Sequence, residues 1–507
     1  MKLISLYIEN YKKFKRKEIV FWESQSEIEK MLYRNATITA FIGLNGTGKT
    51  TILSLIANIF RNLERSQAKI PTDFKLNYEI NDHQVSIQRY EEVVYMRIDG
   101  KETFVLPERG RRKGQDYYNK EKVPSDYTEK TKKFHEILDF IPRRVIVSGF
   151  DSEYELEYPI NLLATKLLKI NSKLYYENTY GMDLSEGIFK FINMYFQNQQ
   201  LNYIFKKMNI SFVNKIFARY SHPTFYKFES GENIHDRFYE ELGYCYLEDY
   251  GKFLIKKSDI PYFDDLMKIK KKYPKEFRDF YNEDFITGEF FEVFGNEMDV
   301  DGFNVIFNFE HFHKDYIMEL IFILLKHKHL YFNDVIIKRN EGEEYKIKNM
   351  STGEKLLFGR LFFLLTHIEN DCILIIEEPE LHLNYSWNKH LLPILSILLK
   401  EYDCHLLISS HNYSFINSLF SEQIRILEND EIKTPEFNTF LADERVILDK
   451  LVDNEQMENR FEEVVIQALK EEDRASLKAF FEAMGESFLK VMVFKKLLEL
   501  GEINVES

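Results

Sequence analysis

Residues Gly43 to Thr50 read GLNGTGKT, and this motif is the strongest indication of the fold class. Before it, Ala36 to Ile42 is an apolar run typical of a buried strand, and the apolar residues after it recur at helical spacing. Gly43, Gly46 and Gly48 let backbone N–H groups turn inward, because no Cβ stands in the way. A strand, a glycine-rich loop and a helix in this order predict an α/β protein with a phosphate-binding loop.

The side chains of this loop suit a nucleoside triphosphate. Lys49 would place its charge on the β- and γ-phosphates, and Thr50 would offer its hydroxyl to Mg²⁺. The residues that we expect to contact nucleotide here are Gly43, Asn45, Gly46, Thr47, Gly48, Lys49, Thr50 and Thr51.

Two other strand ends carry side chains suited to hydrolysis. In CILIIEE, Cys372 to Glu378, we expect Glu377 to hold Mg²⁺ and Glu378 to act as general base on the attacking water. His411 follows the apolar run CHLLISS and would hydrogen-bond the γ-phosphate. The alternatives are a helix start before Pro379 for the glutamates and a structural role for the histidine. The accompanying phosphate loop favours catalysis.

A fourth motif, STGEK from Ser351 to Lys355, precedes a strongly apolar helix. Ser351, the N–H of Gly353 and the positive end of that helix would form an anion site, with Glu354 beside them. The same residues form a capping box, Ser351 with Glu354 three residues on. The two roles are compatible.

Together, GLNGTGKT, STGEK, IIEEPELHLN and SSHN resemble the ABC-type ATPases of the SMC and OLD lineage. The resemblance covers roughly residues 1–155 and 296–440. It implies a mixed sheet with an antiparallel β subdomain, and hydrolysis of ATP with Mg²⁺. It also implies a homodimer or higher homo-oligomer in which Ser351 and Gly353 of one protomer close over the nucleotide of the other. The family's Q-loop glutamine is absent after RRVIVSGF, which leaves Asp151 as a candidate metal sensor.

The rest of the sequence predicts four regions. We expect ATPase lobe I at 1–155, a helical insertion at 156–295, lobe II at 296–443 and an all-helical tail at 444–507. The insertion is rich in aromatic residues and lacks sustained heptads, so it does not predict a long coiled coil.

With these regions, the whole chain looks similar to ATPase subunits of bacterial anti-phage systems such as Septu and the retron-associated ATPases, with the PARIS ATPase as a sibling. This looser resemblance implies that the ATPase regulates a separate effector, a nuclease of the HNH or Toprim type, bound through the C-terminal helices. An SMC-like DNA-repair or DNA-tethering ATPase is the alternative, and it would need a long coiled coil. The soluble engine of an ABC transporter is a third reading, and it would need a membrane partner.

Composition sets the remaining limits. The net charge of −14 argues against wholesale nucleic-acid coating, although three lysine- and arginine-rich runs leave local DNA or RNA contact open. Three cysteines without a CxxC pair, no signal peptide and no membrane-spanning apolar run predict a soluble cytoplasmic protein. The pairs His311/His313 and His327/His329 lack further ligands nearby, so we do not expect a metal there.

Overall fold

The computed structural model describes most of the chain outside the insertion. The described residues are 1–22, 25–64, 70–90, 93–100, 102–106, 108–109, 116–117, 137–149, 167–171, 184–220, 225–227, 244–247, 253–256, 260–275, 304–308, 315–339, 342, 344–380, 383–428, 431–451, 460–485 and 488–501. The expected metal sensor Asp151 and the pair His311/His313 lie outside these ranges.

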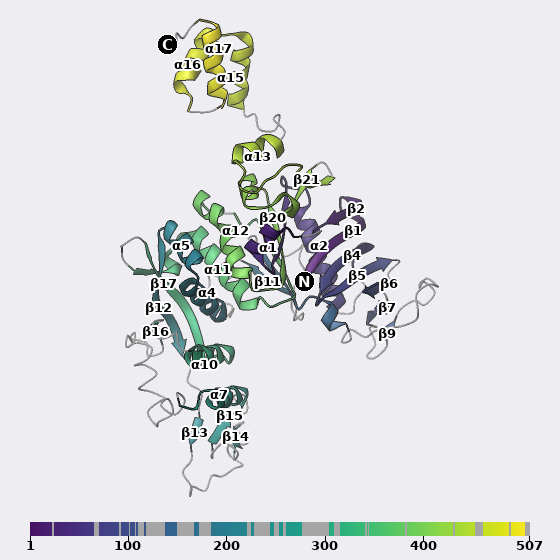
Figure 1. Cartoon of the computed structure of the whole chain (residues 1–507), viewed down its shortest axis with the longest axis vertical. Helices are drawn as coiled ribbons and strands as arrows, with labels where there is room; N and C mark the ends of the chain where they lie inside the picture. Colours follow the sequence, from purple (N-terminus) through teal and green to yellow (C-terminus); the bar gives the residue numbers. More distant parts are fainter. Residues whose placement is uncertain are drawn as a thin grey trace.

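A seven-stranded sheet forms the centre of the molecule (Figure 1). Its neighbouring strands, in order, are β11 (Leu167–Asn171), β10 (Arg144–Gly149), β19 (Cys372–Glu377), β20 (Cys404–Ser410), β3 (Thr37–Ile42), β21 (Ile424–Glu428) and β22 (Glu431–Lys433). All neighbouring pairs are parallel except β21 and β22. Every residue of β3, β19 and β20 is buried, as their continuous apolar sequences predict for parallel strands.

The central sheet separates two hydrophobic cores, because successive strand residues point to opposite faces. Ile375 and Leu407 pack on one face with helix α2 (Lys49–Glu64). Leu374 and Leu406 pack on the other with helices α11 (Thr352–His367) and α12 (Tyr385–Leu399). The phosphate loop therefore begins a helix that is fixed against the sheet along its length.

A six-stranded antiparallel sheet covers the outer side of α2 and supplies the rest of the first core. Its strands, in order, are β2 (Phe14–Val20), β1 (Lys2–Tyr11), β4 (Phe74–Ile80), β5 (His83–Tyr90), β6 (Val93–Ile98) and β7 (Glu102–Leu106). Asp99 and Gly100 both have positive φ, 50° and 67°, and form the turn between β6 and β7. This sheet is the predicted antiparallel β subdomain; the short pair β8 (Glu108–Arg109) and β9 (Asp116–Tyr117) follows it in the chain.

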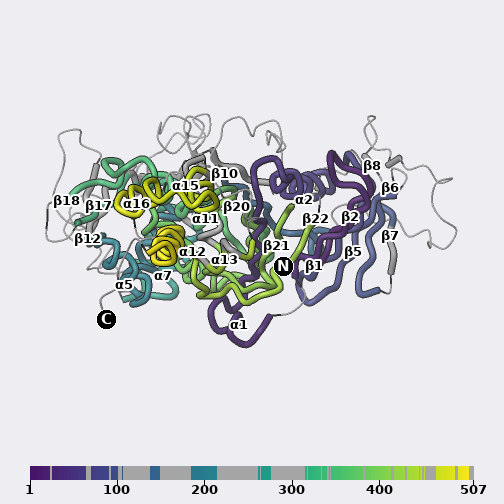
Figure 2. Tube along the Cα trace, turned by 90° about the horizontal axis from the view of Figure 1, so that it is seen from above, coloured from purple at the N-terminus to yellow at the C-terminus, as the bar shows by residue number. Residues whose placement is uncertain are grey.

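A second antiparallel sheet lies on the other side of the body, as Figures 1 and 2 both show. Its order is β16 (Asn304–Asn308), β12 (Ile210–Tyr220), β17 (Leu330–Arg339) and β18 (Glu344–Lys346). Helices α4 (Ser185–Gln197), α5 (Gln199–Lys207) and α10 (Asp315–Lys326) belong to the same core. Gly187 of α4 lies so close to α11 that a Cβ there would stand 1.8 Å from the carbonyl oxygen of Phe362.

The insertion is mixed α/β, which corrects the expectation of a helical insertion at 156–295. Besides α4, α5 and α7 (Ile260–Lys272), it contains β11, β12 and a small sheet of β13 (Phe225–Lys227), β15 (Phe253–Lys256) and β14 (Tyr244–Leu247). The physical reason is long-range pairing: β12 is held by β16 and β17, and β11 extends the central sheet. Short aromatic-rich segments can form a helix or a strand, and the presence of a pairing partner decides which of the two forms.

The described residues of the expected all-helical tail form four helices, and these do not pack as one unit. Helix α13 (Glu444–Leu451) buries Ile447 completely in the main core. Helices α15 (Arg460–Glu471), α16 (Arg474–Ala483) and α17 (Phe488–Glu499) enclose a small core of their own, drawn in yellow in Figure 1. In the part of the chain that the structure describes, no helix is both long and apolar enough to cross a membrane.

Candidate active site

The phosphate loop connects the end of β3 to the start of α2. Gly46 and Gly48 have φ values of 78° and 98°, which an L side chain adopts only with strain. A Cβ on Gly48 would also lie 2.7 Å from Phe14 Cζ, so both the backbone and the space require glycine. The Lys49 ammonium folds over this loop and donates to the carbonyl oxygens of Gly43 at 2.6 Å and Leu44 at 3.0 Å.

The charge of Lys49 interacts with the carboxylates at and directly after the end of β19, two strands away from β3. Lys49 is 6% exposed, and its burial lowers its pKa. The negative charges of Glu378, Glu380 and Glu377, in decreasing order, act in the opposite direction. The expected cation and the expected carboxylates therefore converge in one place.

Sheet topology explains this convergence. β3, β20 and β19 are parallel neighbours, so their carboxyl ends meet at one edge of the sheet. Glu377 is the last residue of β19 and is 1% exposed. Glu378 has a φ of 42°, and its N–H donates to the carbonyl oxygen of Ser409 on β20 at 2.8 Å. This uncommon conformation turns the chain sharply directly after the strand, as is frequent at active sites.

His411 reaches the same edge from the end of β20. Its Nδ1 lies 3.6 Å from Glu378 Oε1 and 3.7 Å from Glu380 Oε1. The histidine side chain is 41% exposed, whereas that of Glu380 is 4% exposed. Lys49, Glu378 and His411 thus lie at the same edge of the sheet, and the roles that the sequence assigns to them stay predictions.

Thr50 and Glu377 fit the expected Mg²⁺ by the chemistry of their donors. A hydroxyl and a carboxylate supply oxygen ligands, which Mg²⁺ prefers, and this ion usually takes its other ligands from water and substrate phosphates. Among the described residues, no group of three or more His, Cys, Asp or Glu could hold a metal by itself. In the pair His327/His329, where we did not expect a metal, His327 Nε2 lies 2.9 Å from Asp265 Oδ2.

The STGEK motif caps helix α11 through the predicted capping box. The N–H and Oγ of Ser351 both donate to Glu354 Oε2, at 3.1 and 2.6 Å. Arg339 of β17 and Trp387 of α12 bond the other oxygen of Glu354. Glu354, 8% exposed, therefore stabilises the start of the helix, and these partners come from α11, β17 and α12 rather than from the phosphate loop.

Three residues of the site had no assigned role in the sequence. Lys13, from the turn between β1 and β2, donates to the carbonyl oxygen of Gly46 at 3.1 Å and adds a second cation at the loop. Glu380 accepts hydrogen bonds from Ser410 Oγ and the His411 N–H. Arg360 of α11 donates to the carbonyl oxygen of Glu377 at 3.3 Å. The sequence could have indicated Glu380, because it is a third glutamate directly after IIEEP. Nothing in the sequence pointed to Lys13 or Arg360 as residues of the site.

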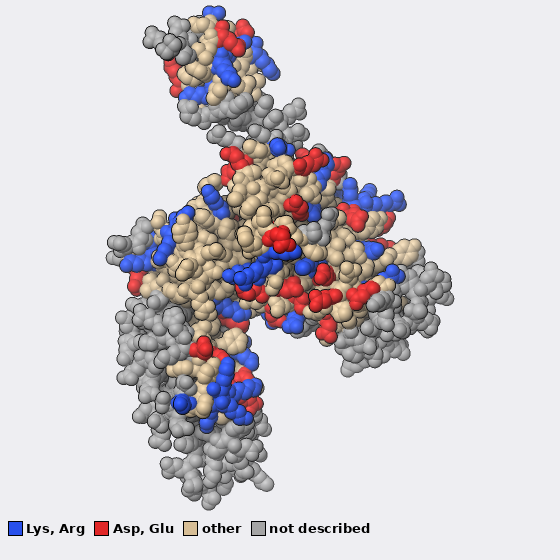
Figure 3. Space-filling view, in the orientation of Figure 1, with Lys and Arg blue, Asp and Glu red and all other residues tan. Residues whose placement is uncertain are grey.

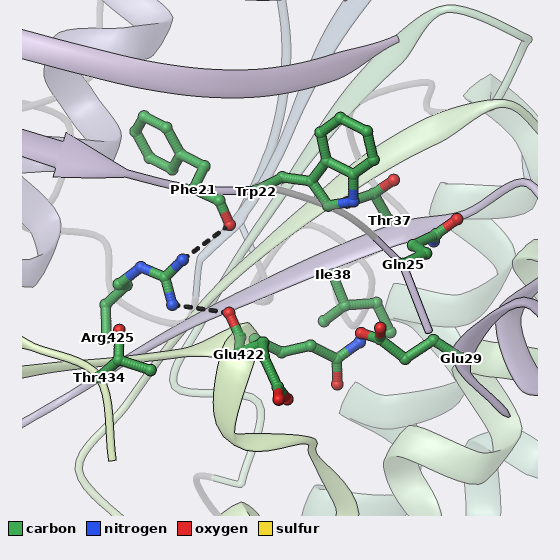
Figure 4. Close-up of a pocket in the computed structure, with 10 residues that line it drawn as sticks. Phe21, Trp22, Gln25, Glu29, Thr37, Ile38, Glu422, Arg425 and Thr434 are labelled. Atoms are coloured by element: carbon green, nitrogen blue, oxygen red, sulfur yellow. Dashed lines mark hydrogen bonds between the residues drawn. The ribbon is translucent and has the colours of Figure 1, made fainter. Parts of the chain in front are cut away.

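A separate pocket lies near the amino end of β3 (Figure 4). Its lining is polar and aromatic and comprises Phe21, Trp22, Gln25, Glu29, Thr37, Ile38, Glu422, Gln423, Arg425 and Thr434. Arg425 donates to the carbonyl oxygens of Glu422 at 2.7 Å and Phe21 at 3.2 Å, and so ties the start of β21 to the end of β2. Because Thr37 starts β3 and the phosphate loop follows its end, this pocket does not belong to the nucleotide site.

The basic run at residues 268–272 is paired with carboxylates, whereas Arg111, Arg112 and Lys113 lie outside the described residues. In α7, Lys268 pairs with Asp265 at 2.7 Å, and Lys272 pairs with Glu319. Acidic and basic side chains are interspersed over the central body in Figure 3. DNA or RNA contact stays a prediction.

Comparison with known proteins gives a family and a distant likeness in fold. The model of the AAA ATPase domain matches residues 1–416, which contain all four motifs. Solved structures similar to this chain include the Smc head domain of Pyrococcus furiosus bound to the C-terminal domain of ScpA and the SMC head domain from Thermotoga maritima. Each has 11% identity and a TM-score of 0.34 over 86% of this chain, and over 96% and 100% of the respective structure. No curated protein matches the chain.

Proposed function

Because the chain belongs to the AAA ATPase domain family, we propose that it binds ATP with Mg²⁺ and hydrolyses the anhydride bond between the β- and γ-phosphates at the edge formed by β3, β19 and β20. The observation that carries the proposal is the convergence of Lys49, Glu378 and His411 from three separate segments. A phosphate loop alone binds nucleotide, whereas hydrolysis also needs a group that accepts the proton of water.

Each side chain has a distinct role in this mechanism. Lys49 leaves its two loop carbonyls to contact the β- and γ-phosphates. Glu378 accepts the proton of the attacking water, and His411 hydrogen-bonds the γ-phosphate. When bound, Mg²⁺ neutralises phosphate charge, held by Thr50 and Glu377.

Glu378→Gln tests the hydrolytic role. The amide keeps the shape of the side chain but cannot serve as general base, so turnover should fall about 10²- to 10⁴-fold while ATP affinity stays close to wild type. Glu431→Ala, at an exposed surface position paired with Lys433, is the matched control and should leave both unchanged. Unchanged turnover in the Glu378 variant would exclude this carboxylate as the base.

We further propose that the working form is a homodimer, or a higher assembly of such pairs, in which STGEK of one protomer closes the nucleotide site of the other. The support is that Ser351 and Glu354 bond to α11, β17 and α12, and so form a surface apart from the loop around Lys49. The site around ATP bound at Lys49 would thus be incomplete until a second protomer binds.

Mixing two inactive variants tests this composite site. Lys49→Ala removes the loop cation, and Ser351→Arg blocks the signature surface. If sites are shared, each mixed dimer contains one intact site, and an equimolar mixture should recover about a quarter of wild-type activity. If each protomer completes its own site, the mixture stays inactive.

We propose that helices α15–α17 bind a separate effector, a nuclease in an anti-phage system, whose activity follows the nucleotide state. The support is that this unit lies beyond the residues matched by the family, has its own core, and exposes Val464, Val491 and Met492 by 42–51%. Truncation after Leu451 removes the unit while keeping Ile447 in the main core. The truncated chain should keep ATPase activity yet no longer co-purify with the product of a neighbouring gene; retained co-purification would place the partner elsewhere.

The DNA-repair or tethering alternative is less well supported. It requires a long coiled coil between the two halves of the core. The described helices of that region, α4, α5, α7 and α10, have 13, 9, 13 and 12 residues.

A further inference from the structure

Glu380 lies between the two strand ends that carry the hydrolytic groups. Its carboxylate is buried, and Oε1 accepts hydrogen bonds from Ser410 Oγ and from the His411 N–H, the latter at 3.2 Å. The turn after β19 is thereby fastened to the end of β20 by a side chain, in addition to the Glu378 N–H bond to Ser409.

We propose that Glu380 is a positioning residue that sets the orientation of His411 toward Glu378 and the γ-phosphate. This inference rests on the proposed ATPase function and adds to it a group that acts through His411.

The geometry explains why His411 needs such support. Its ring is 41% exposed, so packing restrains it little, and its direction depends on the backbone from which it projects. Glu380 holds the N–H of that residue directly. It also holds the Ser410 hydroxyl, which in turn accepts the Asn412 N–H at 2.9 Å. The backbone on both sides of the histidine is therefore anchored to one carboxylate.

The charge of Glu380 interacts with that of the buried Arg360 guanidinium. Arg360 of α11 is 5% exposed, and burial lowers the pKa of its guanidinium to about 9. Glu380 opposes this effect more strongly than Glu377 does. A buried carboxylate near a buried guanidinium is tolerated in a core, whereas either alone would be costly. The anchor thus lies in a buried charge environment that includes Arg360 of α11, the helix that begins at STGEK.

Two substitutions separate positioning from direct chemistry. Glu380→Ala removes both hydrogen bonds to the His411 segment and should lower kcat about 30-fold, the scale of a displacement near 1 Å, with ATP affinity changed less than about threefold. In Glu380→Gln the amide oxygen can still accept both bonds, so this variant should recover most of the lost activity. Hydrogen exchange at the His411 amide should be at least about tenfold faster in the alanine variant and close to wild type in the glutamine variant.

Each other outcome has a definite meaning. If Glu380→Gln is as slow as Glu380→Ala, the carboxylate acts chemically or on the metal, and positioning is refuted. If Glu380→Ala turns over at the wild-type rate, or its slow turnover comes without faster exchange at His411, the inference is also wrong. Glu378→Gln, measured alongside, separates the two levels: unchanged turnover there would remove the proposed function itself.

Discussion

Acidification should destabilise the main body of the protein through one buried histidine, His405. The imidazole lies inside β20 and is 0% exposed. Its Nδ1 accepts the Leu3 N–H at 2.8 Å, and its Nε2 lies 2.9 Å from Thr39 Oγ1. The Thr39 hydroxyl donates to the carbonyl oxygen of Phe21 at 3.0 Å, so Nε2 must carry the ring proton. A second proton on Nδ1 would face the Leu3 N–H, and the folded state therefore holds the neutral ring.

The size of the effect follows from the shift in pKa. Burial lowers the pKa of His405 from 6.5 to about 3. The unfolded chain, with the ordinary pKa, takes up the proton first as the pH falls, so protonation favours unfolding. The stabilisation is complete above about pH 6.5 and is lost progressively as the pH falls toward 3. Between pH 7 and pH 5 this group alone should remove about 2 kcal/mol from the free energy of unfolding.

Urea unfolding followed by tryptophan fluorescence measures this loss. The two tryptophans, Trp22 and Trp387, both lie in the main body, so the signal does not report the C-terminal helices. His405→Asn keeps an acceptor near the Nδ1 position and cannot titrate. The wild type should lose about 2 kcal/mol more than this variant between pH 7 and pH 5. Burial also lowers the pKa of His367, to about 4, but that residue is present in both proteins and its effect cancels. Equal losses in the two proteins would show that His405 does not cause this loss of stability.

Three further substitutions test the loop and the packing. Gly48→Ala places a Cβ 2.7 Å from its neighbours at a φ of 98°, and we expect ATP affinity by calorimetry to fall at least about tenfold with an unchanged circular dichroism spectrum. Lys13→Gln removes the second cation at the loop and should weaken ATP binding about three- to tenfold, whereas Lys15→Gln, on an exposed side chain nearby, should not. Gly187→Ala should cost about 3 kcal/mol and lower the melting temperature by several degrees, because its Cβ meets a carbonyl of α11 at 1.8 Å. Gly485→Ala, with open space around it, is the control and should melt like the wild type.

The sequence was sufficient where local pattern and final environment agree. β3, β19 and β20 are buried on both faces, and such strands have continuous apolar sequences whatever surrounds them. The capping box at Ser351 is decided within four residues, and so is the turn at Asp99 and Gly100. Order along the chain then placed Glu378 and His411 at one edge, because parallel neighbours share their carboxyl ends.

The sequence was insufficient where partners lie far away in the chain. β12 is a strand because β16 and β17 pair with it. The pattern of apolar and polar residues within β12 does not predict that pairing. Lys13 belongs to a basic run that is also typical of a solvent-exposed turn. Its contact with the Gly46 carbonyl is formed only in the folded chain, so the sequence could not predict it. Arg360 occurs within an apolar helix with no neighbouring carboxylate in sequence. Its partner, the end of β19, is brought near by packing across the central sheet.

Four buried charges lie at the edge where the motifs meet, and they are an argument for function that does not depend on motif recognition. Lys49, Glu377, Glu380 and Arg360 are each at most 6% exposed, and buried charges persist only when they compensate one another, as these two cations and two anions do. Glu378 adds an uncommon backbone conformation at the same point. A chain selected for stability alone would place apolar residues there, because replacing buried ion pairs with well-packed apolar side chains is often neutral or stabilising. The retention of four buried charges around one strand end therefore indicates a task that apolar residues cannot perform, and binding and hydrolysis of a triphosphate is such a task.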